Sequence, residues 1–226
     1  MTTKLCVFDA YGTLFDVAAA ARVAAAEPGR AALAAVWEQL SEDWRRKQLE
    51  YSWLRAIAGD YVPFWQVTCD GLDWAMDRAG LSEDMELRER LLALYWELAA
   101  YKEVPFMLAH LQAQGMATAI LSNGSKDMLE GAVDSSGLRG YLHAVLSVEE
   151  VCIFKPARAV YDLVGKHFDV TPDEVLFVSS NGWDVAGAAA YGFRTVWVNR
   201  AGLPVDRLMA EPAHVLSDLT TIPELI

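Results

Sequence analysis

Cysteine, histidine and basic residues are all scarce in this 226-residue chain. The three cysteines, Cys6, Cys69 and Cys152, are odd in number and far apart, so neither a disulfide framework nor a thiolate metal site is indicated. The four histidines are scattered and show no metal-ligand spacing. Only 19 Lys and Arg stand against 31 Asp and Glu. This acidic balance argues against nucleic acid or a membrane surface as partner, because both are bound through excess positive charge.

The chain also lacks the patterns of export and of membrane insertion. No apolar run approaches the length that spans a bilayer, and the first residues show no basic, apolar and small-residue order of a secretory leader. Together with the cysteine usage, this predicts a soluble, cytoplasmic protein. Hydrophobic residues make up 54% of the chain, so a sizeable core can be buried. The length suits one large α/β domain, or a core domain that carries a smaller insert.

One stretch near the start of the chain links a predicted strand to a reactive group. Between Leu5 and Leu14, an apolar run ends in Asp9 and then turns at Gly12. This pattern is typical of a strand buried in a parallel sheet, with Asp9 at its carboxyl end. Ligands of open α/β sheets bind in the crevice outside these ends, so a carboxylate placed there is a candidate nucleophile. The alternative is that Asp9 only caps the turn.

The remainder of the chain divides by its hydrophobic periodicity. Helical spacing predominates up to about residue 98, which predicts an all-helical insert. After Val104, helices alternate with short apolar strands, and this alternation is the signature of a parallel sheet. The helices of the insert are predicted over residues 17–35, 36–55, 65–79 and 87–98, and the later strands over residues 117–121, 144–147, 175–178 and 195–198.

Polar residues follow several of the predicted strands and should converge at one edge of the sheet. The motifs are FDAYGTLFD at 8–16, WRRKQLEYSW at 44–53, LSNG at 121–124, FKP at 154–156 and VSSNGWD at 178–184. Together they resemble the L-2-haloacid dehalogenases of the haloacid dehalogenase (HAD) superfamily, over essentially the whole chain. The resemblance implies an α/β fold with a Rossmann-like parallel sheet core at residues 1–15 and 101–226. An α-helical cap domain would be inserted at residues 16–100.

Two departures from the phosphatases of this superfamily bear on the chemistry. Those enzymes carry a second carboxylate two positions after the nucleophile, and here that residue is Tyr11. They also hold magnesium through acidic residues in the last loop, where this chain has Ser179, Ser180 and Asn181. A magnesium-dependent phosphatase is thus a weaker alternative, and a non-catalytic HAD relative is another. The expectation is an enzyme without metal or organic cofactor.

The resemblance implies hydrolysis of short L-2-haloalkanoic acids to D-2-hydroxy acids. Asp9 would displace the halide and form an ester, which water then hydrolyses. Arg45 and Asn123 would accept the halide, and Asp184 would activate the water with help from Asn181. Without the resemblance, Arg45 reads as a surface arginine pairing with Glu42 or Glu50, and Asp184 as an ordinary residue of a first helical turn.

Further roles follow from the same resemblance. Ser122 and the backbone amide of Tyr11 would hold the substrate carboxylate, and Lys155 would supply positive charge near Asp9. Thr13 and Ser179 would orient Asp9 and Lys155 through hydrogen bonds. The plainer alternatives are an ordinary turn at Ser122, a solvated loop lysine at position 155, and backbone capping by the two hydroxyls.

Three aromatic residues complete the predicted site. Tyr161 and Trp183 match positions that line the site of the family, and Phe64 would form an apolar wall from the insert. Aromatic residues at such positions are more often part of a core. The aromatic faces of the insert could form a homodimer contact, although they could equally pack within a monomer.

Overall fold

A six-stranded parallel sheet forms the centre of the protein, whose computed structural model describes residues 2–226. The strand order is β3-β2-β1-β4-β5-β6. The strands are β1 (Leu5–Phe8), β2 (Ala117–Ser122), β3 (Ala144–Ser147), β4 (Val175–Ser179), β5 (Arg194–Val198) and β6 (His214–Leu216). The apolar runs read as strands in the sequence are strands here, and β1 and β4 are fully buried, as a sheet covered on both faces requires. The sequence reading missed β6, a three-residue edge strand with only partial burial.

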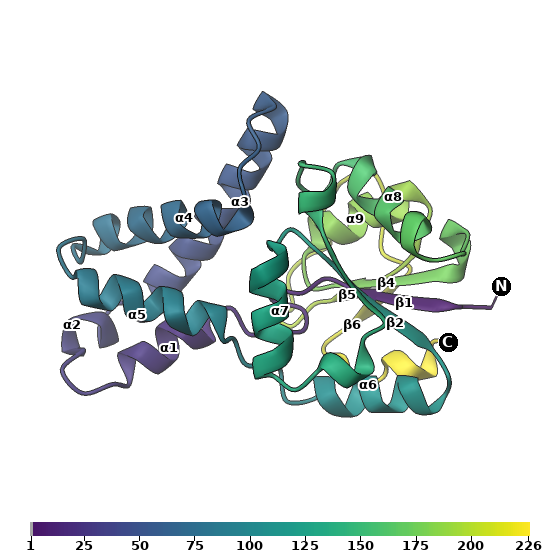
Figure 1. Cartoon of the computed structure of the whole chain (residues 1–226), viewed down its shortest axis with the longest axis horizontal. Coiled ribbons are helices and arrows are strands. Elements are labelled where there is room, and N and C mark those ends of the chain that lie inside the picture. The colour runs from purple at the N-terminus through teal and green to yellow at the C-terminus, as the bar shows by residue number, and fades with distance from the viewer. Residues whose placement is uncertain (1) are drawn as a thin grey trace.

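Helices cover both faces of the sheet, as Figure 1 shows. Helices α6 (Val104–Ala113) and α7 (Lys126–Ser135) belong to one face, and α8 (Arg158–His167) and α9 (Gly182–Tyr191) to the other. Strand β1 lies between β2 and β4, so the chain builds the sheet outward from β1 in both directions. The carboxyl ends of β1 and β4 therefore flank the crevice in which open α/β sheets bind ligands.

Five helices stand beside the carboxyl ends of the strands, at the end of the molecule away from the N-terminus (Figure 1). They are α1 (Ala19–Ala25), α2 (Ala31–Ala34), α3 (Trp37–Ala58), α4 (Phe64–Ala79) and α5 (Met85–Trp96). The two connections to the sheet run side by side, because Phe15 and Ala100 form a bridge and the Tyr101 N–H donates to the Leu14 carbonyl at 2.9 Å. The domain division at residues 15/16 and 100/101 stays a prediction, and it coincides with this paired crossing.

A buried polar cluster fixes α3 against its neighbours. Trp44 Nε1 donates to the Thr68 carbonyl at 2.8 Å, and Gln48 Nε2 donates to Thr68 Oγ1 at 3.0 Å. Tyr95 Oη donates to Gln48 Oε1 at 3.2 Å. Gly71 lies where α4 comes close to α3, and a Cβ there would be 3.4 Å from the Gln48 backbone nitrogen. With its buried polar groups paired, this cluster holds the helix that carries Arg45 in a defined position.

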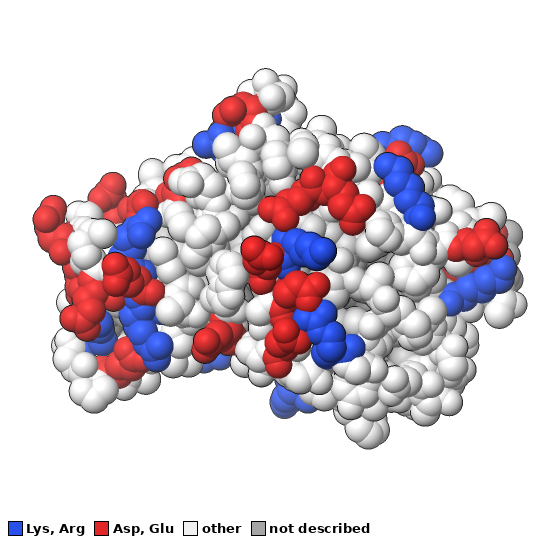
Figure 2. All heavy atoms as spheres, viewed as in Figure 1, with Lys and Arg blue, Asp and Glu red and all other residues white. Residues whose placement is uncertain are grey.

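The surface carries both signs of charge. On the face shown in Figure 2, Lys and Arg side chains lie among Asp and Glu rather than forming a basic area of their own. Within the described chain, no helix combines the length and the apolar character that crossing a bilayer requires.

Candidate active site

Asp9 lies immediately after β1, at the edge of the sheet that faces the helical insert. Its backbone N–H donates to the Val178 carbonyl of β4 at 2.9 Å, which continues the pairing of the two central strands. The chain then turns at Gly12, whose φ of +88° strongly favours glycine. The Asp9 residue is only 6% exposed. The sequence pattern thus delivers a nearly buried carboxylate to the crevice.

Three hydrogen-bond donors from three different segments hold the Asp9 carboxylate. Lys155 Nζ lies 3.2 Å from Oδ1, while Thr13 Oγ1 and Asn181 Nδ2 each donate to Oδ2 at 2.9 Å. Thr13 is itself fixed, because its Oγ1 accepts the backbone N–H of Ser180 at 2.8 Å. The loops after β1, β3 and β4 therefore meet at one carboxylate, and their donors fix the position of both of its oxygens.

Lys155 is buried between two carboxylates. Its Nζ lies 2.7 Å from Asp184 Oδ2 in addition to its contact with Asp9, and Lys155 is 1% exposed. Burial acts to lower the pKa of this ammonium group, but Asp184 and Asp9 outweigh burial and raise the pKa above its usual value. Lys155 is thus a charged group of the site and not a solvated loop lysine.

Asp184 sits in the first turn of α9, with its side chain turned inward. Burial raises the pKa of Asp184 to about 6, against the opposing effect of Lys155. Tyr161 Oη donates to Asp184 Oδ1 at 2.8 Å. Burial also raises the pKa of Tyr161, so the phenol keeps its proton at neutral pH. Asp184 is therefore more basic than an ordinary carboxylate, and its two oxygens are held by different donors.

Arg45 reaches from α3 of the insert into the same crevice. Its Nη2 donates to the Tyr11 carbonyl at 3.1 Å and to Asn181 Oδ1 at 3.3 Å. In the described chain it pairs with neither acidic residue suggested by the sequence, since Glu50 is bound by Arg46 and Lys47. The insert thus adds a guanidinium group to the residues around Asp9.

Ser122, Asn123 and Ser179 hold the backbone of the site. Asn123 Oδ1 accepts the Lys155 backbone N–H at 2.9 Å, and Ser122 Oγ accepts the N–H of Gly124 at 3.1 Å. Ser179 Oγ accepts the N–H of Asn181 at 3.1 Å. Among the hydrogen bonds of residues 2–226, none joins Ser179 to Lys155. The Ser179 hydroxyl instead caps nearby backbone, which was the alternative to a role in orienting Lys155. All three are almost fully buried beside the strand ends.

Aromatic side chains close the site on the side of the insert. The Tyr11 ring stacks on Phe64 and on Tyr95, with centroid distances of 6.2 and 5.6 Å. The hydroxyl of Tyr11 is buried and has no hydrogen-bond partner among the described residues. Trp183 meets Trp53 edge to face at 5.3 Å, joining α9 to α3. Phe64 of the insert thus packs on Tyr11, and Trp183 of α9 packs on Trp53 of the insert.

Sequence reasoning missed Arg200, which follows β5. Its Nη2 donates to the Thr13 carbonyl at 3.2 Å, and its guanidinium group lies 3.8 Å from the centroid of the Tyr101 ring. Arg200 Nη1 also lies 2.7 Å from Glu103 Oε1. Arg200 therefore ties the loop after β1 to the second connection of the insert. A signal was available, because Asn199 and Arg200 are polar residues that follow a predicted strand, as in the other loops of the site.

The donor set around Asp9 contains few hard metal ligands. Within residues 2–226, no group of three or more His, Cys, Asp and Glu side chains is arranged so that it could hold a metal ion. The site is instead one buried cation between two carboxylates, with hydroxyl and amide donors around it.

The chain is similar in sequence and in structure to known proteins over most or all of its length. The sequence model of the haloacid dehalogenase-like hydrolases matches residues 3–192. The chain is 46% identical over 223 residues to (S)-2-haloacid dehalogenase 1 of Pseudomonas sp. (strain CBS-3), a match that covers 99% of this chain and 96% of that protein. A crystal structure of a dehalogenase with an intermediate complex superposes with a TM-score of 0.94 at 40% identity, covering 100% and 97% of the two chains. The L-2-haloacid dehalogenase of Xanthobacter autotrophicus with chloropropionic acid covalently bound gives 0.86 at 38% identity, covering 99% and 98%.

Proposed function

This chain belongs to the haloacid dehalogenase-like hydrolase family, and from that premise we propose that it hydrolyses short L-2-haloalkanoic acids to D-2-hydroxy acids. The observation that carries the proposal is the environment of Asp9. Three donors hold this carboxylate, and the residue two positions later is Tyr11 and not a second acid. A carboxylate without a neighbouring general acid suits displacement at carbon, where the leaving halide needs no proton.

In the first step, an Asp9 oxygen attacks the halogen-bearing carbon from the side opposite the halogen. The new carbon–oxygen bond forms as the carbon–halogen bond breaks, and the halide leaves with the electron pair. Arg45 and the amide nitrogen of Asn123 accept the halide, since guanidinium and amide donors stabilise developing negative charge. The contact of Arg45 with the Tyr11 carbonyl and with Asn181 supports this placement.

In the second step, water attacks the carbonyl carbon of the Asp9 ester. Asp184 takes one proton of that water while its oxygen bonds to the carbonyl carbon. The bond from this carbon to the substrate oxygen then breaks, the departing oxygen takes the second proton, and the hydroxy acid and the Asp9 carboxylate are released. A pKa of about 6 suits Asp184 to this role, because a base is most effective when its pKa lies near the working pH. Asn181, which contacts both Asp9 and Arg45, assists by orienting the water.

The substrate carboxylate binds at Ser122 and at the backbone amide of Tyr11. Lys155 provides positive charge near Asp9, and the buried Phe64 and the indole of Trp183 form apolar walls. Thr13 fixes the reactive oxygen of Asp9 through its 2.9 Å hydrogen bond. Tyr161 and Ser179 hold Asp184 and the loop at Asn181, as their hydrogen bonds indicate.

The test is halide release from L- and D-2-chloropropionate in the presence of a chelator, with chiral analysis of the product. We expect chloride release from the L-isomer only, with D-lactate as the product. Asp9→Asn is the matched control, because it keeps the size of the side chain and removes the nucleophile. Absence of release from either isomer, together with magnesium-dependent hydrolysis of a phosphate ester, would assign the chain to the phosphatases. Inactivity in both assays would favour the non-catalytic relative.

We also propose that the protein is a cytoplasmic homodimer. The three cysteines form no disulfide with one another, which suits a reducing compartment. Exposed apolar side chains on the insert, including Val23 and Met85, offer area for a contact between copies. Sedimentation equilibrium distinguishes a dimer from a monomer.

A further inference from the structure

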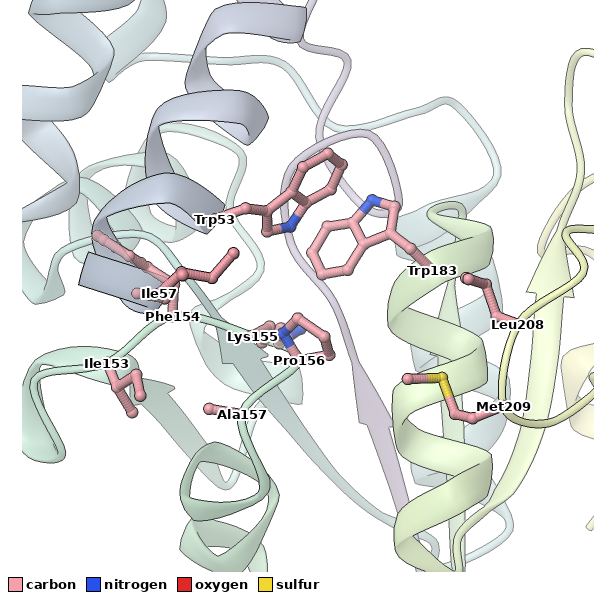
Figure 3. Close-up of a pocket in the computed structure, with 11 residues that line it drawn as sticks. Trp53, Ile57, Ile153, Phe154, Lys155, Pro156, Ala157, Trp183, Leu208 and Met209 are labelled. Atoms are coloured by element: carbon pink, nitrogen blue, oxygen red, sulfur yellow. The ribbon is translucent and has the colours of Figure 1, made fainter. Parts of the chain in front are cut away.

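An apolar pocket of about 470 Å³ opens beside the catalytic centre (Figure 3). Its walls come from the end of α3, the segment before α8, the start of α9, and the loop after β5. In Figure 3, Trp53 and Trp183 lie along one side, and Leu208 and Met209 stand across from Ile57. The volume lies within the range of small-molecule sites, about 300–1,000 Å³.

Two residues of the pocket lining also belong to the site. One is Lys155, whose Nζ lies 3.2 Å from Asp9 Oδ1. The other is Trp183, which lies between Asn181 and Asp184 in the chain. At the outer end, Ile57 is 84% exposed and Met209 is 64% exposed. The apolar lining therefore runs from exposed residues at the surface to Lys155 and Trp183, two residues of the site.

The part of the site around the Tyr11 ring is already filled. Tyr11 is 2% exposed and stacks on Phe64, which is 1% exposed. Phe64 in turn packs edge to face against Phe154 at 6.1 Å. A long substituent on the reacting carbon would have to disrupt this packed cluster or extend toward the open pocket.

On the basis of the proposed function, we infer that this pocket binds the side chain of the substrate, and that among short L-2-haloalkanoic acids the protein prefers those whose apolar side chain is longer than methyl, such as the hexanoate. The carboxylate and the halogen remain at the polar site, and the tail lies between Trp53, Ile57 and Met209. Each buried methylene group should raise kcat/KM about fourfold. Three additional methylene groups should raise it by roughly 60-fold if all are buried.

The experiment compares kcat/KM for L-2-bromopropionate and L-2-bromohexanoate, with bromide release as the readout. Ile57→Asp places a charge at the mouth of the pocket, and Ala157→Phe fills its interior. Leu54→Asp is the matched control, because Leu54 is also an exposed apolar residue of α3 but does not line this pocket. Because Ile57 is 84% exposed, its replacement should leave folding intact. The Ile57 variant therefore still tests the inference if Ala157→Phe does not fold.

We expect the wild type to prefer the hexanoate by at least about tenfold, allowing for incomplete burial at the open mouth. Ile57→Asp should remove most of this preference while bromopropionate turnover stays within about twofold, and Leu54→Asp should keep the preference. Equal rates for the two acids in the wild type would overturn the inference while leaving the proposed function intact. An unchanged preference in Ile57→Asp with altered sedimentation would make the pocket a contact between copies and would also overturn it. No bromide release from either acid would overturn both proposals.

Discussion

Replacing Lys155 by Met should destabilise the protein strongly at neutral pH and much less in acid. Lys155 Nζ lies 2.7 Å from Asp184 and 3.2 Å from Asp9. At an effective dielectric constant of about 20, these distances correspond to attractions of about 6 and about 5 kcal/mol. The burial cost of the ammonium group offsets much of this sum, so the expected net loss is about 3–5 kcal/mol, as when one partner of a buried pair is removed.

The pH dependence follows from the carboxylate that loses its partner. In the wild type, burial already raises the pKa of Asp184 to about 6, and the loss of Lys155 raises the pKa further. A carboxyl whose pKa is higher in the folded state binds more protons folded than unfolded. Stability therefore falls as pH rises from the unfolded value of about 3.9 through the folded value. The difference from the wild type should be largest at pH 8 and small at pH 5.

Guanidinium chloride unfolding at pH 5 and pH 8 measures the loss of stability and its dependence on pH. Lys166→Met, on the exposed face of α8, is the matched control and should leave both midpoints unchanged. The double variant Lys155→Met with Asp184→Asn should recover much of the stability at pH 8, because it removes the unpaired buried charge. A loss that is equal at both pH values, or that grows in acid, would refute the assignment of Lys155 as the counter-ion of buried carboxylates.

Three further predictions concern the chemical steps. Arg45→Lys should lower kcat by about 10²-fold because the lysine loses the planar donors, whereas Arg46→Lys should leave kcat near wild type in the same halide assay. Asp184→Asn should trap the ester on Asp9, visible as an adduct in intact-protein mass spectra, and wild-type turnover should decline as pH falls below about 6, where Asp184 becomes protonated. Normal turnover of Asp184→Asn without an adduct would place the water-activating base elsewhere. Thr13→Val should reduce kcat roughly tenfold through loss of one hydrogen bond to the carboxylate, and an unchanged rate would remove Thr13 from the orientation of Asp9.

The parts of the fold that depend on local pattern could be predicted from the sequence. Strand β1 and the strands after it are apolar runs bounded by turns, and the buried Leu40, Trp44 and Gln48 of the long α3 recur every four residues. The position of Asp9, Lys155 and Asp184 after strands or at helix starts follows from the same pattern. Strand β6 has no such signal, because three partly exposed residues at an edge cannot show a period.

The partners of each side chain depended on tertiary structure. Arg45 carries the local signature of a surface residue, and only the packing of α3 against α4 and α1 turns its guanidinium group toward the Tyr11 carbonyl. For Ser179, the motif suggested a contact with Lys155. In the structure, the Ser179 hydroxyl instead accepts a hydrogen bond from the Asn181 backbone N–H. A motif therefore identifies which residue types stand at the strand ends. The hydrogen-bond partner of each of these residues depends on how the loops pack together in the folded protein.

The pocket beside the site could not be predicted from the sequence either. Its lining joins Ile57 at the end of α3 to Ala157 before α8 and to Met209 in a loop after β5, and these segments share no motif. Single apolar residues on a surface are common and carry no signal on their own. The polar residues that perform the reaction are fixed by the sheet, where parallel strands end at one edge. The choice of substrate is instead a property of the contact between the insert and the core, so variants at Ile57 and Ala157 should change it without touching Asp9.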